Sequence, residues 1–310
     1  MITVGGFNTS LDKALEADEL RLGAVNRVRD VRAYPGGKGL HVALAAAALG
    51  EAVRLVGLID APHRRLFEDF LGARGVEFHG VAVEGGLRTC LAIREVGATR
   101  VTEILEPGPP VDAGTRREMC DRFLSLARDA GIAVLSGSAP PGFDDSVYGE
   151  LSCALGEAGV RCLVDASASL LRRAVEARPF LIKPNREEAE ALTGSSIDGP
   201  AAAARAGRAL VDRGIAAVVI SLGAEGAVGM SGGRAWRVSA PVQDSRNTVG
   251  SGDCLVGGLA VGLARGLGFE EVLRLGVACG AANALTPETG HIRIADVEAL
   301  RPRATVESLG

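Results

Sequence analysis

Short apolar runs alternate with amphipathic stretches through the middle of the chain. Four runs rich in valine, leucine and isoleucine end in glycine or polar residues, as buried strands do: IAVLSGS, VRCLVDAS, PFLIKPN and AAVVISLG. Between them we expect helices at 145–158, 170–177, 187–192 and 201–213. A repeated order of strand then helix predicts a parallel sheet with helices on both faces, which is an α/β fold.

The first third of the chain continues this core and contains two interruptions. Strands at 2–4 and 53–58 flank an expected helix at 42–49. Segments at about 17–34 and 81–106 depart from that order, and in the second of them TCLAIREV and TRVTEIL alternate as antiparallel strands do. We therefore expect a small accessory sheet inserted into a single domain of residues 1–310, which closes with helices at 253–266 and 270–285.

Composition and charge restrict the partners of the chain. Of its 310 residues, 47% are hydrophobic and 23% are charged, as in folded globular proteins. Thirty-four basic residues against thirty-eight acidic ones give a net charge of −4 without a basic run, so we expect no nucleic-acid partner. The longest stretch without a charged residue or histidine, 130–143, is shorter than the roughly 20 residues of a membrane span, so we expect no membrane partner.

The sequence also lacks the usual signals for export, disulfides and zinc. Its first residues carry acidic side chains and no basic segment before an apolar one, so we expect no signal peptide and a cytoplasmic location. Six cysteines without a CxxC pair and only four histidines predict free thiols rather than a disulfide framework or a zinc site.

A glycine-rich turn before an apolar helix is the strongest candidate for chemistry. In NTVGSGD, residues 247–253, two glycines leave backbone N–H groups free at a helix N-terminus, where an anion can bind. Asp253 in the first turn either caps the helix or supplies a reactive carboxylate. The segment is neither a GxxxxGK[ST] phosphate loop nor a dinucleotide fingerprint, because the required lysine and third glycine are missing.

Two further segments have polar residues where a ligand could bind. PGGKGLHVA, residues 35–43, combines close backbone approach with one cation, Lys38, and reads either as a sugar or phosphate contact or as a flexible turn. KPNREE, residues 183–188, follows a predicted strand, and ligands of open parallel sheets bind at the carboxyl ends of strands.

Ten segments in order resemble the ribokinase/PfkB-like carbohydrate kinase family over nearly the whole chain. They are FNTSLD, GAVNRV, GGKGLHVA, LRT, TEILEPGP, LSGSAPPG, VDAS, KPNREEAEALTG, SLGAEGA and TVGSGD. The resemblance implies a ribokinase-like three-layer α/β/α core with a mostly parallel sheet and a small β-sheet lid. GAVNRV, GGKG, TEILEPGP and SGSAPPG are similar to the phosphosugar kinase branch, which contains 1-phosphofructokinases, tagatose-6-phosphate kinases and a minor type of 6-phosphofructokinase.

The resemblance implies ATP-dependent phosphorylation of a ketohexose phosphate, which gives a bisphosphate and ADP. Fructose 1-phosphate or tagatose 6-phosphate is expected ahead of fructose 6-phosphate. Asp253 would be the general base, and the backbone of Gly250, Ser251 and Gly252 would form the anion hole. Asn185 and Glu188 match an NxxE motif that places Mg²⁺ through water.

The same resemblance assigns the binding residues. The sugar side would comprise Asp12, Gly37, Lys38, His41, Arg88 and Ser138, with Lys38 and Arg88 on the substrate's existing phosphate. The nucleotide side would comprise Lys183, Asn185, Ser221, Gly223, Gly226 and Asn283. Asn283 is expected to face the adenine or, alternatively, to be a surface or packing residue. An unpaired edge of the lid would join a second copy into a homodimer.

The chain departs from the family at four places. His41 stands where the family usually has asparagine, Ser251 replaces the more usual alanine, and Ala168 replaces glycine after VDAS. A segment LIDAPHRR replaces a glycine-rich turn, and its Arg64 and Arg65 are either phosphate contacts or a solvated helix start. Two other functions therefore stay open: a kinase of an unphosphorylated sugar or nucleoside, and a non-catalytic sugar-phosphate binding protein.

Overall fold

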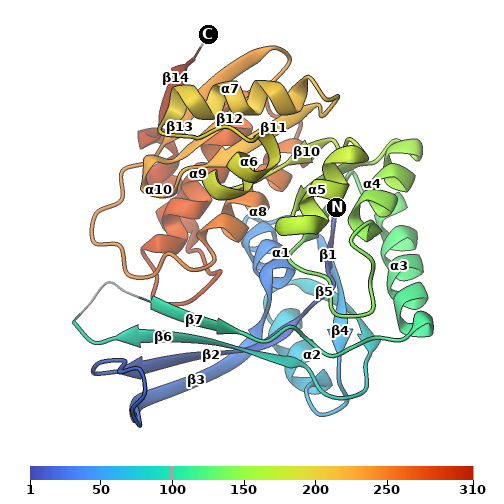
Figure 1. The fold of residues 1–310 in the computed structure, drawn as a ribbon, viewed down its shortest axis with the longest axis vertical. Coiled ribbons are helices and arrows are strands. Elements are labelled where there is room, and N and C mark those ends of the chain that lie inside the picture. Colours follow the sequence, from blue (N-terminus) through green and yellow to red (C-terminus); the bar gives the residue numbers. More distant parts are fainter. Residues whose placement is uncertain (98–100, 310) are drawn as a thin grey trace.

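The computed structural model describes residues 1–97 and 101–309, which form two sheets and their covering helices (Figure 1). The larger sheet has ten strands. In spatial order they are β14 (Thr305–Ser308), β13 (Arg234–Ser239), β12 (Ala227–Ser231), β11 (Ala217–Ser221), β10 (Leu181–Ile182), β9 (Arg161–Asp165), β8 (Ile132–Ser136), β1 (Ile2–Gly6), β4 (Val53–Ile59) and β5 (Val76–Ala82).

The strands from β11 to β5 pair in parallel, whereas β12, β13 and β14 continue the sheet in antiparallel pairs. The six core strands expected from the sequence are confirmed as β1, β4, β8, β9, β10 and β11. Every residue of β1 and β8 is buried, which is why these runs are apolar without alternation. The predicted α/β core with a mostly parallel sheet is therefore confirmed.

Helices cover both faces of this sheet and give three layers. One face carries α1 (Lys38–Ala48), α2 (Arg64–Gly72), α8 (Ser251–Ala264), α9 (Phe269–Ala284) and α10 (Ile294–Leu300). The other carries α3 (Ala113–Arg128), α4 (Val147–Glu157), α5 (Ala168–Glu176), α6 (Arg186–Thr193) and α7 (Pro200–Val211). No helix in the described part of the chain is long and apolar enough to cross a membrane.

Small residues let α1, α8 and α9 pack closely. A Cβ atom added at Gly257 would lie 2.7 Å from the Cβ of Ala45 on α1, and one at Gly258 would lie 2.8 Å from the Cα of Gly276 on α9. Such distances leave no room for larger side chains. The close contact of α8 with α1 brings the first turns of the two helices together, and both carry candidate site residues.

The smaller sheet, which we call the lid, lies apart from the layered core in Figure 1 and has the strand order β3-β2-β6-β7. Its strands are β2 (Ser10–Ala17), β3 (Val28–Gly36), β6 (Arg88–Glu95) and β7 (Val101–Leu105). The lid therefore begins before the predicted segment 17–34, and 81–82 of the predicted segment 81–106 belong to β5 in the core. Residues 98–100 of that segment lie outside the described residues.

The expectation of antiparallel pairing in the lid is only partly correct. β2 pairs antiparallel with β3, and β6 pairs antiparallel with β7, but β2 and β6 run parallel. The sequence did not predict most of β2, because SLDKALEA shows no alternation of apolar and polar positions. The reason is that six of its eight residues are half-buried, so neither face of the strand is wholly apolar.

Candidate active site

The turn before α8 has its backbone held open by surrounding residues. Gly250 at the helix N-cap has a φ of 84°, and a Cβ atom there would lie 2.4 Å from the backbone nitrogen of Gly290. Only glycine fits both the conformation and the space. At Gly252 a Cβ would lie 3.6 Å from the Nζ of Lys183, so the Lys183 ammonium lies beside this turn. A helix N-terminus and an ammonium group together favour an anion.

Asn283 holds this turn from the core side. Its Nδ2 donates to the Val249 carbonyl at 2.9 Å and to the Ser251 hydroxyl at 3.0 Å, and its Oδ1 accepts from the His291 backbone N–H at 3.0 Å. The side chain is fully buried. These contacts favour the alternative that Asn283 is a packing residue over a contact with the adenine, because its amide is already used to shape the turn. The hydroxyl of Ser251, absent from the family's usual alanine, adds one of these contacts.

Asp253 lies in the first turn of α8 and is almost fully buried. Its Oδ2 accepts a hydrogen bond from Nδ1 of His41 on α1 at 3.0 Å, and Nε2 of His41 lies 3.5 Å from Oδ2 of Asp12 on β2. Burial favours a neutral His41 ring, but the hydrogen bond to Asp253 and the charges of Asp253 and Asp12 outweigh it and raise the pKa of His41. His41 thus connects a core carboxylate to a lid carboxylate.

Asp12 is oriented by its own strand and by the glycines before α1. The Ser10 hydroxyl donates to Oδ1 of Asp12 at 2.6 Å. A Cβ at Gly36 would lie 2.0 Å from the Asp12 carboxyl carbon, so the carboxylate lies directly over this glycine. Gly37 has a φ of 105° and faces the Asn8 carbonyl and Thr9 backbone, so it provides close packing of the chain where the sequence suggested access for a sugar ring.

The residues predicted for the substrate's phosphate, Lys38 and Arg88, lie together where the lid leaves the core. They line one small cavity with Gly37 and Ser138, which were predicted for the sugar side more generally. Arg88 donates from Nε to the Asn8 carbonyl at 3.1 Å and from Nη1 to the Glu106 carbonyl at 3.2 Å. These bonds fix the guanidinium and leave its Nη2 hydrogens for another partner.

Two lysines share one buried carboxylate. Lys183 Nζ lies 3.1 Å from Oδ1 of Asp165, which ends β9, and both side chains are buried. The charge of Asp165 is also the largest influence that raises the pKa of Lys38, and burial opposes it. Asp165 therefore forms an ion pair with Lys183, and its charge also stabilises the ammonium of Lys38 at the start of α1.

The NxxE pair forms the capping box of α6. Asn185 Oδ1 accepts from the Glu188 backbone N–H at 2.8 Å, and Glu188 Oε2 accepts from the Asn185 N–H at 2.9 Å. The capping box uses neither the other Glu188 oxygen nor the Asn185 amide nitrogen, and neither atom has a hydrogen bond within residues 1–97 and 101–309. No group of three or more His, Cys, Asp or Glu side chains with metal-binding geometry occurs among the described residues. This donor set fits an ion that keeps most of its water ligands, as Mg²⁺ does.

The remaining nucleotide-side residues lie at the end of β11. The Ser221 N–H donates to the Pro184 carbonyl at 3.1 Å, which places Ser221 next to the NxxE segment. Gly223 has a φ of 62° and open space around it. Gly226 has a φ of 90°, and a Cβ there would lie 2.1 Å from the Val238 carbonyl oxygen, so this glycine is needed for packing. Ser221 and Gly223 are accessible at this end of β11, which is consistent with their predicted place on the nucleotide side.

Four residues of the site were not assigned from the sequence, although each lies in or beside a quoted motif. Asn8 donates to the Ser138 hydroxyl at 3.0 Å and to the Pro107 carbonyl at 2.9 Å, so it ties β1 to the end of the lid. Burial, together with the charges of Asp253 and Asp12, raises the pKa of Glu103 on β7. The others are Asp165 and Asn247, whose Oδ1 accepts from the Val249 N–H.

The segment LIDAPHRR, which replaces the family's glycine-rich turn, forms a turn next to the lid. Its contacts are with the protein chain and do not point to a phosphate site. Asp60 Oδ2 accepts from the Leu87 N–H at 2.9 Å, and Oδ1 accepts from His63 Nδ1 at 2.8 Å. Arg64 and Arg65 begin α2, are exposed, and pair with Glu68 and Asp69. The interpretation as a solvated helix start is therefore supported for both arginines.

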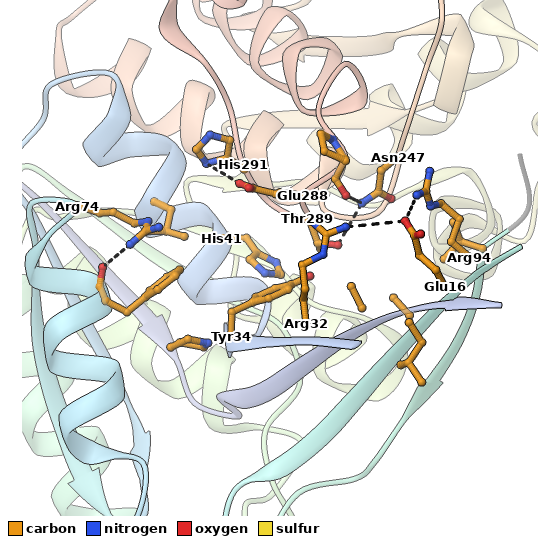
Figure 2. Close-up of a pocket in the computed structure, with 18 residues that line it drawn as sticks. Glu16, Arg32, Tyr34, His41, Arg74, Arg94, Asn247, Glu288, Thr289 and His291 are labelled. Carbon is orange, nitrogen blue, oxygen red and sulfur yellow. Dashed lines mark hydrogen bonds and ion pairs between the residues drawn. The ribbon is translucent and has the colours of Figure 1, made fainter. Parts of the chain in front are cut away.

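A cavity separates the lid from the core beside His41 (Figure 2). In this view His41 forms its inner wall, with Tyr34 and Arg32 of β3 on the lid side and Glu288 and His291 on the core side. The Tyr34 and Thr289 side chains share a hydrogen bond, which joins lid and core. His41, which contacts both Asp12 and Asp253, therefore also borders a space that could hold part of a small ligand.

Comparison with known proteins relates this chain to one family along nearly its whole length. Residues 4–294 match the family described as pfkB family carbohydrate kinase. The chain is 34% identical to a 1-phosphofructokinase of Xanthomonas campestris, covering 91% of this chain and 92% of the relative. It is 30% identical to a tagatose-6-phosphate kinase of Staphylococcus epidermidis, covering 94% of each.

Solved structures give the same relationship. Phosphofructokinase-2 from Escherichia coli in complex with substrates and products superposes with a TM-score of 0.91 at 28% identity, covering 97% of this chain and 98% of that one. A tetrameric inhibited form of the same enzyme superposes with a TM-score of 0.88 at 28% identity over the same shares. The family match includes all of the residues from Asn8 to Asp253.

Proposed function

This chain belongs to the pfkB family of carbohydrate kinases, and from that membership we propose that it transfers the γ-phosphate of ATP to a hydroxyl group of a ketohexose phosphate. It is therefore a phosphotransferase, and its products are a sugar bisphosphate and ADP. The names of its relatives favour fructose 1-phosphate or tagatose 6-phosphate, with fructose 6-phosphate next. Such a reaction is expected in the cytoplasm, where ATP is available.

The single observation that carries the proposal is a buried carboxylate next to an anion-binding turn. Asp253 lies in the helix turn whose N-cap is Gly250, and the Lys183 ammonium lies beside Gly252. A hydroxyl group bound at Asp253 would lose its proton to the carboxylate as its oxygen attacks phosphorus. The N–H groups of the turn and the ammonium would stabilise the charge on the transferred phosphoryl group.

Magnesium is proposed to bind ATP near the NxxE pair. Mg²⁺ would neutralise phosphate charge there, and Glu188 has one carboxylate oxygen outside its capping box for a water ligand. The capping box itself fixes Asn185 and Glu188 relative to α6 without any bound ion. The protein's part is thus to orient the donors before ATP arrives.

The proposed phosphate site of the acceptor consists of Arg88 and Lys38. Arg88 is held by two backbone carbonyls, so its remaining N–H groups are oriented in advance. Lys38 keeps its positive charge because Asp165 raises its pKa. An unphosphorylated sugar would make no use of this pair.

The lid is proposed to join two copies of the chain. The strand register places Val31, Leu91 and Ile104 on the lid face that points away from Asp12. Val31 is 49% exposed and Ile104 is 53% exposed. An apolar face of this kind on a sheet with open edges favours a homodimer.

The test is the release of ADP in the presence of Mg·ATP with fructose 1-phosphate, tagatose 6-phosphate, fructose 6-phosphate or fructose, and with Asp253→Asn as the matched variant. We expect turnover of a phosphosugar and a loss of about 100-fold or more in the variant. Turnover of fructose alone would contradict the proposed acceptor class. Binding of phosphosugars without turnover would instead support a sugar-phosphate binding protein.

Arg88→Ala tests whether the acceptor is a phosphorylated sugar or a neutral one. Loss of a charge-assisted contact should raise KM for the phosphosugar about 10- to 100-fold, since such bonds contribute about 1.5 to 3 kcal/mol. KM for ATP should change little. An unchanged KM for the phosphosugar would place its phosphate elsewhere.

A further inference from the structure

His41 lies between the two carboxylates that the proposed reaction needs. Its Nδ1 is 3.0 Å from Asp253 Oδ2, and its Nε2 is 3.5 Å from Asp12 Oδ2. The ring is 5% exposed, and Nε2 has no hydrogen-bond partner in the described part of the chain. A neutral imidazole has one N–H, so one ring nitrogen would present a lone pair to a carboxylate. Only the imidazolium form offers an N–H to both.

The other charges around the ring favour the same form. Asp12 of β2 and Asp253 of α8 face it with carboxylates, the charge of Glu103 on β7 also acts on it, and the positive charge of Lys38 on α1 opposes them. The adjoining cavity is also lined by Arg32 and Arg94, which pair with Glu16, and by Arg74, which donates to the Phe70 carbonyl. The backbone of Gly290 packs against the ring from the core loop and brings no charge. Three carboxylates in one partly dry site repel each other and an incoming phosphate, so a second cation there stabilises the site.

We propose that His41 is a positioning residue that, as an imidazolium, holds the base Asp253 and the sugar-binding Asp12 together and offsets their charge for an anionic acceptor. This inference rests on the proposed function for the roles of the two carboxylates. It assigns to His41 a part different from the sugar contact that the family's usual asparagine implies. Asparagine at this position would keep a donor but would carry no charge.

The arrangement has two consequences for the reaction. The hydrogen bond from His41 occupies Oδ2 of Asp253 and leaves Oδ1 to receive the proton of the acceptor hydroxyl. The positive charge also lowers the electrostatic cost of placing a phosphorylated sugar beside Asp12 and Asp253. As the pH rises through the raised pKa of His41, the ring loses this charge, so kcat/KM for the phosphosugar should fall.

The first test measures the charge of His41 without any reaction. The chain has four histidines, so comparing ring NMR signals of the wild type with those of His41→Asn identifies His41 directly. We expect its signals to titrate with a midpoint above the ordinary value of about 6.5, and the midpoint to fall in Asp253→Asn. A midpoint at or below the ordinary value, or one that Asp253→Asn does not move, would overturn the proposal.

The second test follows kcat/KM for the phosphosugar from pH 6 to 9. The kcat/KM of the wild type should fall at alkaline pH, and the midpoint of this fall should equal the midpoint found by NMR. The kcat/KM of His41→Asn should not change with pH over the same range. His41→Gln serves as a second variant if His41→Asn does not fold. His291→Asn is the matched control, because this histidine lines the same cavity and its ring pairs with Glu288 alone among the described residues, so the variant should keep the wild-type alkaline decline.

The outcomes separate this inference from the proposed function. If His41 titrates high but no sugar phosphate is turned over, the reaction is wrong and the charge assignment stands. If phosphosugars are turned over and the alkaline decline persists in His41→Asn, the charge of His41 has no part in the reaction and the inference is wrong.

Discussion

The Lys183 ammonium and the Asp165 carboxylate form a buried ion pair, 3.1 Å apart, across the ends of the adjacent strands β9 and β10. The second carboxylate oxygen of Asp165 has no hydrogen-bond partner in the described part of the chain. The Asp165 charge is also the largest influence that raises the pKa of Lys38. Asp165 therefore holds Lys183 directly and helps to keep Lys38 charged, and the proposed reaction uses both cations.

Asp165→Asn should destabilise the protein and weaken ATP binding. Removing one partner of a buried pair leaves Lys183 uncompensated, which costs about 3 to 5 kcal/mol in the free energy of unfolding. Urea denaturation measures this cost, and KM for ATP should rise. Glu176→Gln is the control, because its pair with Arg173 is exposed and should contribute less than about 1 kcal/mol. Equal losses in the two variants would contradict the special position of Asp165.

Gly250→Ala should remove most activity. The added Cβ meets the backbone nitrogen of Gly290 at 2.4 Å and occupies a conformation with a φ of 84°, so the anion-hole turn must shift. A shifted donor should lower kcat by about 100-fold or more, as loss of an anion-hole donor does. Gly266→Ala has a similar φ of 66° but open space around it, so its kcat should stay near the wild-type value.

Asp60 should make stability depend on pH at the acidic end. Burial opposes ionisation, but the hydrogen bonds from Leu87 and His63 outweigh it and lower the pKa of Asp60. A group whose pKa is lower in the folded state stabilises the protein at pH values above its unfolded-state pKa. This stabilisation is lost as the pH falls through the folded-state pKa. Urea denaturation should therefore give a larger free energy of unfolding for the wild type than for Asp60→Asn at pH 6. The difference between the two free energies should shrink towards pH 3. A difference that is constant with pH would refute this role.

Val31→Glu should convert a dimer into a monomer, because it places a charge on the apolar face of the lid. Light scattering after size-exclusion chromatography gives the mass directly. Leu66→Glu is the matched control, since Leu66 is 42% exposed on α2, outside the lid. A wild type that is monomeric at all concentrations tested would rule out the proposed homodimer.

The sequence predicts the core well because burial on both faces leaves a plain signal. Strands such as β8 are continuous apolar runs, and the polar residues that follow them lie at the expected edge of the sheet. The lid was less predictable, because β2 has no clean alternation and its parallel partner β6 lies about 80 residues away in the chain. Pairing between distant strands is set by tertiary contacts, which a local pattern does not contain.

Backbone shape at the candidate site can be predicted where a short motif fixes it, whereas contacts between side chains from distant segments cannot. The glycine turn at Gly250 lies at a helix N-terminus, as its residue types predict, and the NxxE pair at Asn185, predicted as a magnesium motif, forms a capping box. The burial of Asn283 depends on the loop that ends at His291, and the contact of His41 with Asp253 depends on how α1 packs against α8. Neither arrangement leaves a trace in local sequence.

The parallel pairing of β2 with β6 gives the lid a base and a far end. Ser10 and Arg88 are register partners at the points where the two strands leave the core. Glu16 and Arg94 are register partners six residues further on, about 20 Å along the strands. The arginine proposed for the phosphate of the acceptor therefore belongs to the part of the lid that is anchored to the core, and a substitution at the far end should leave its position unchanged.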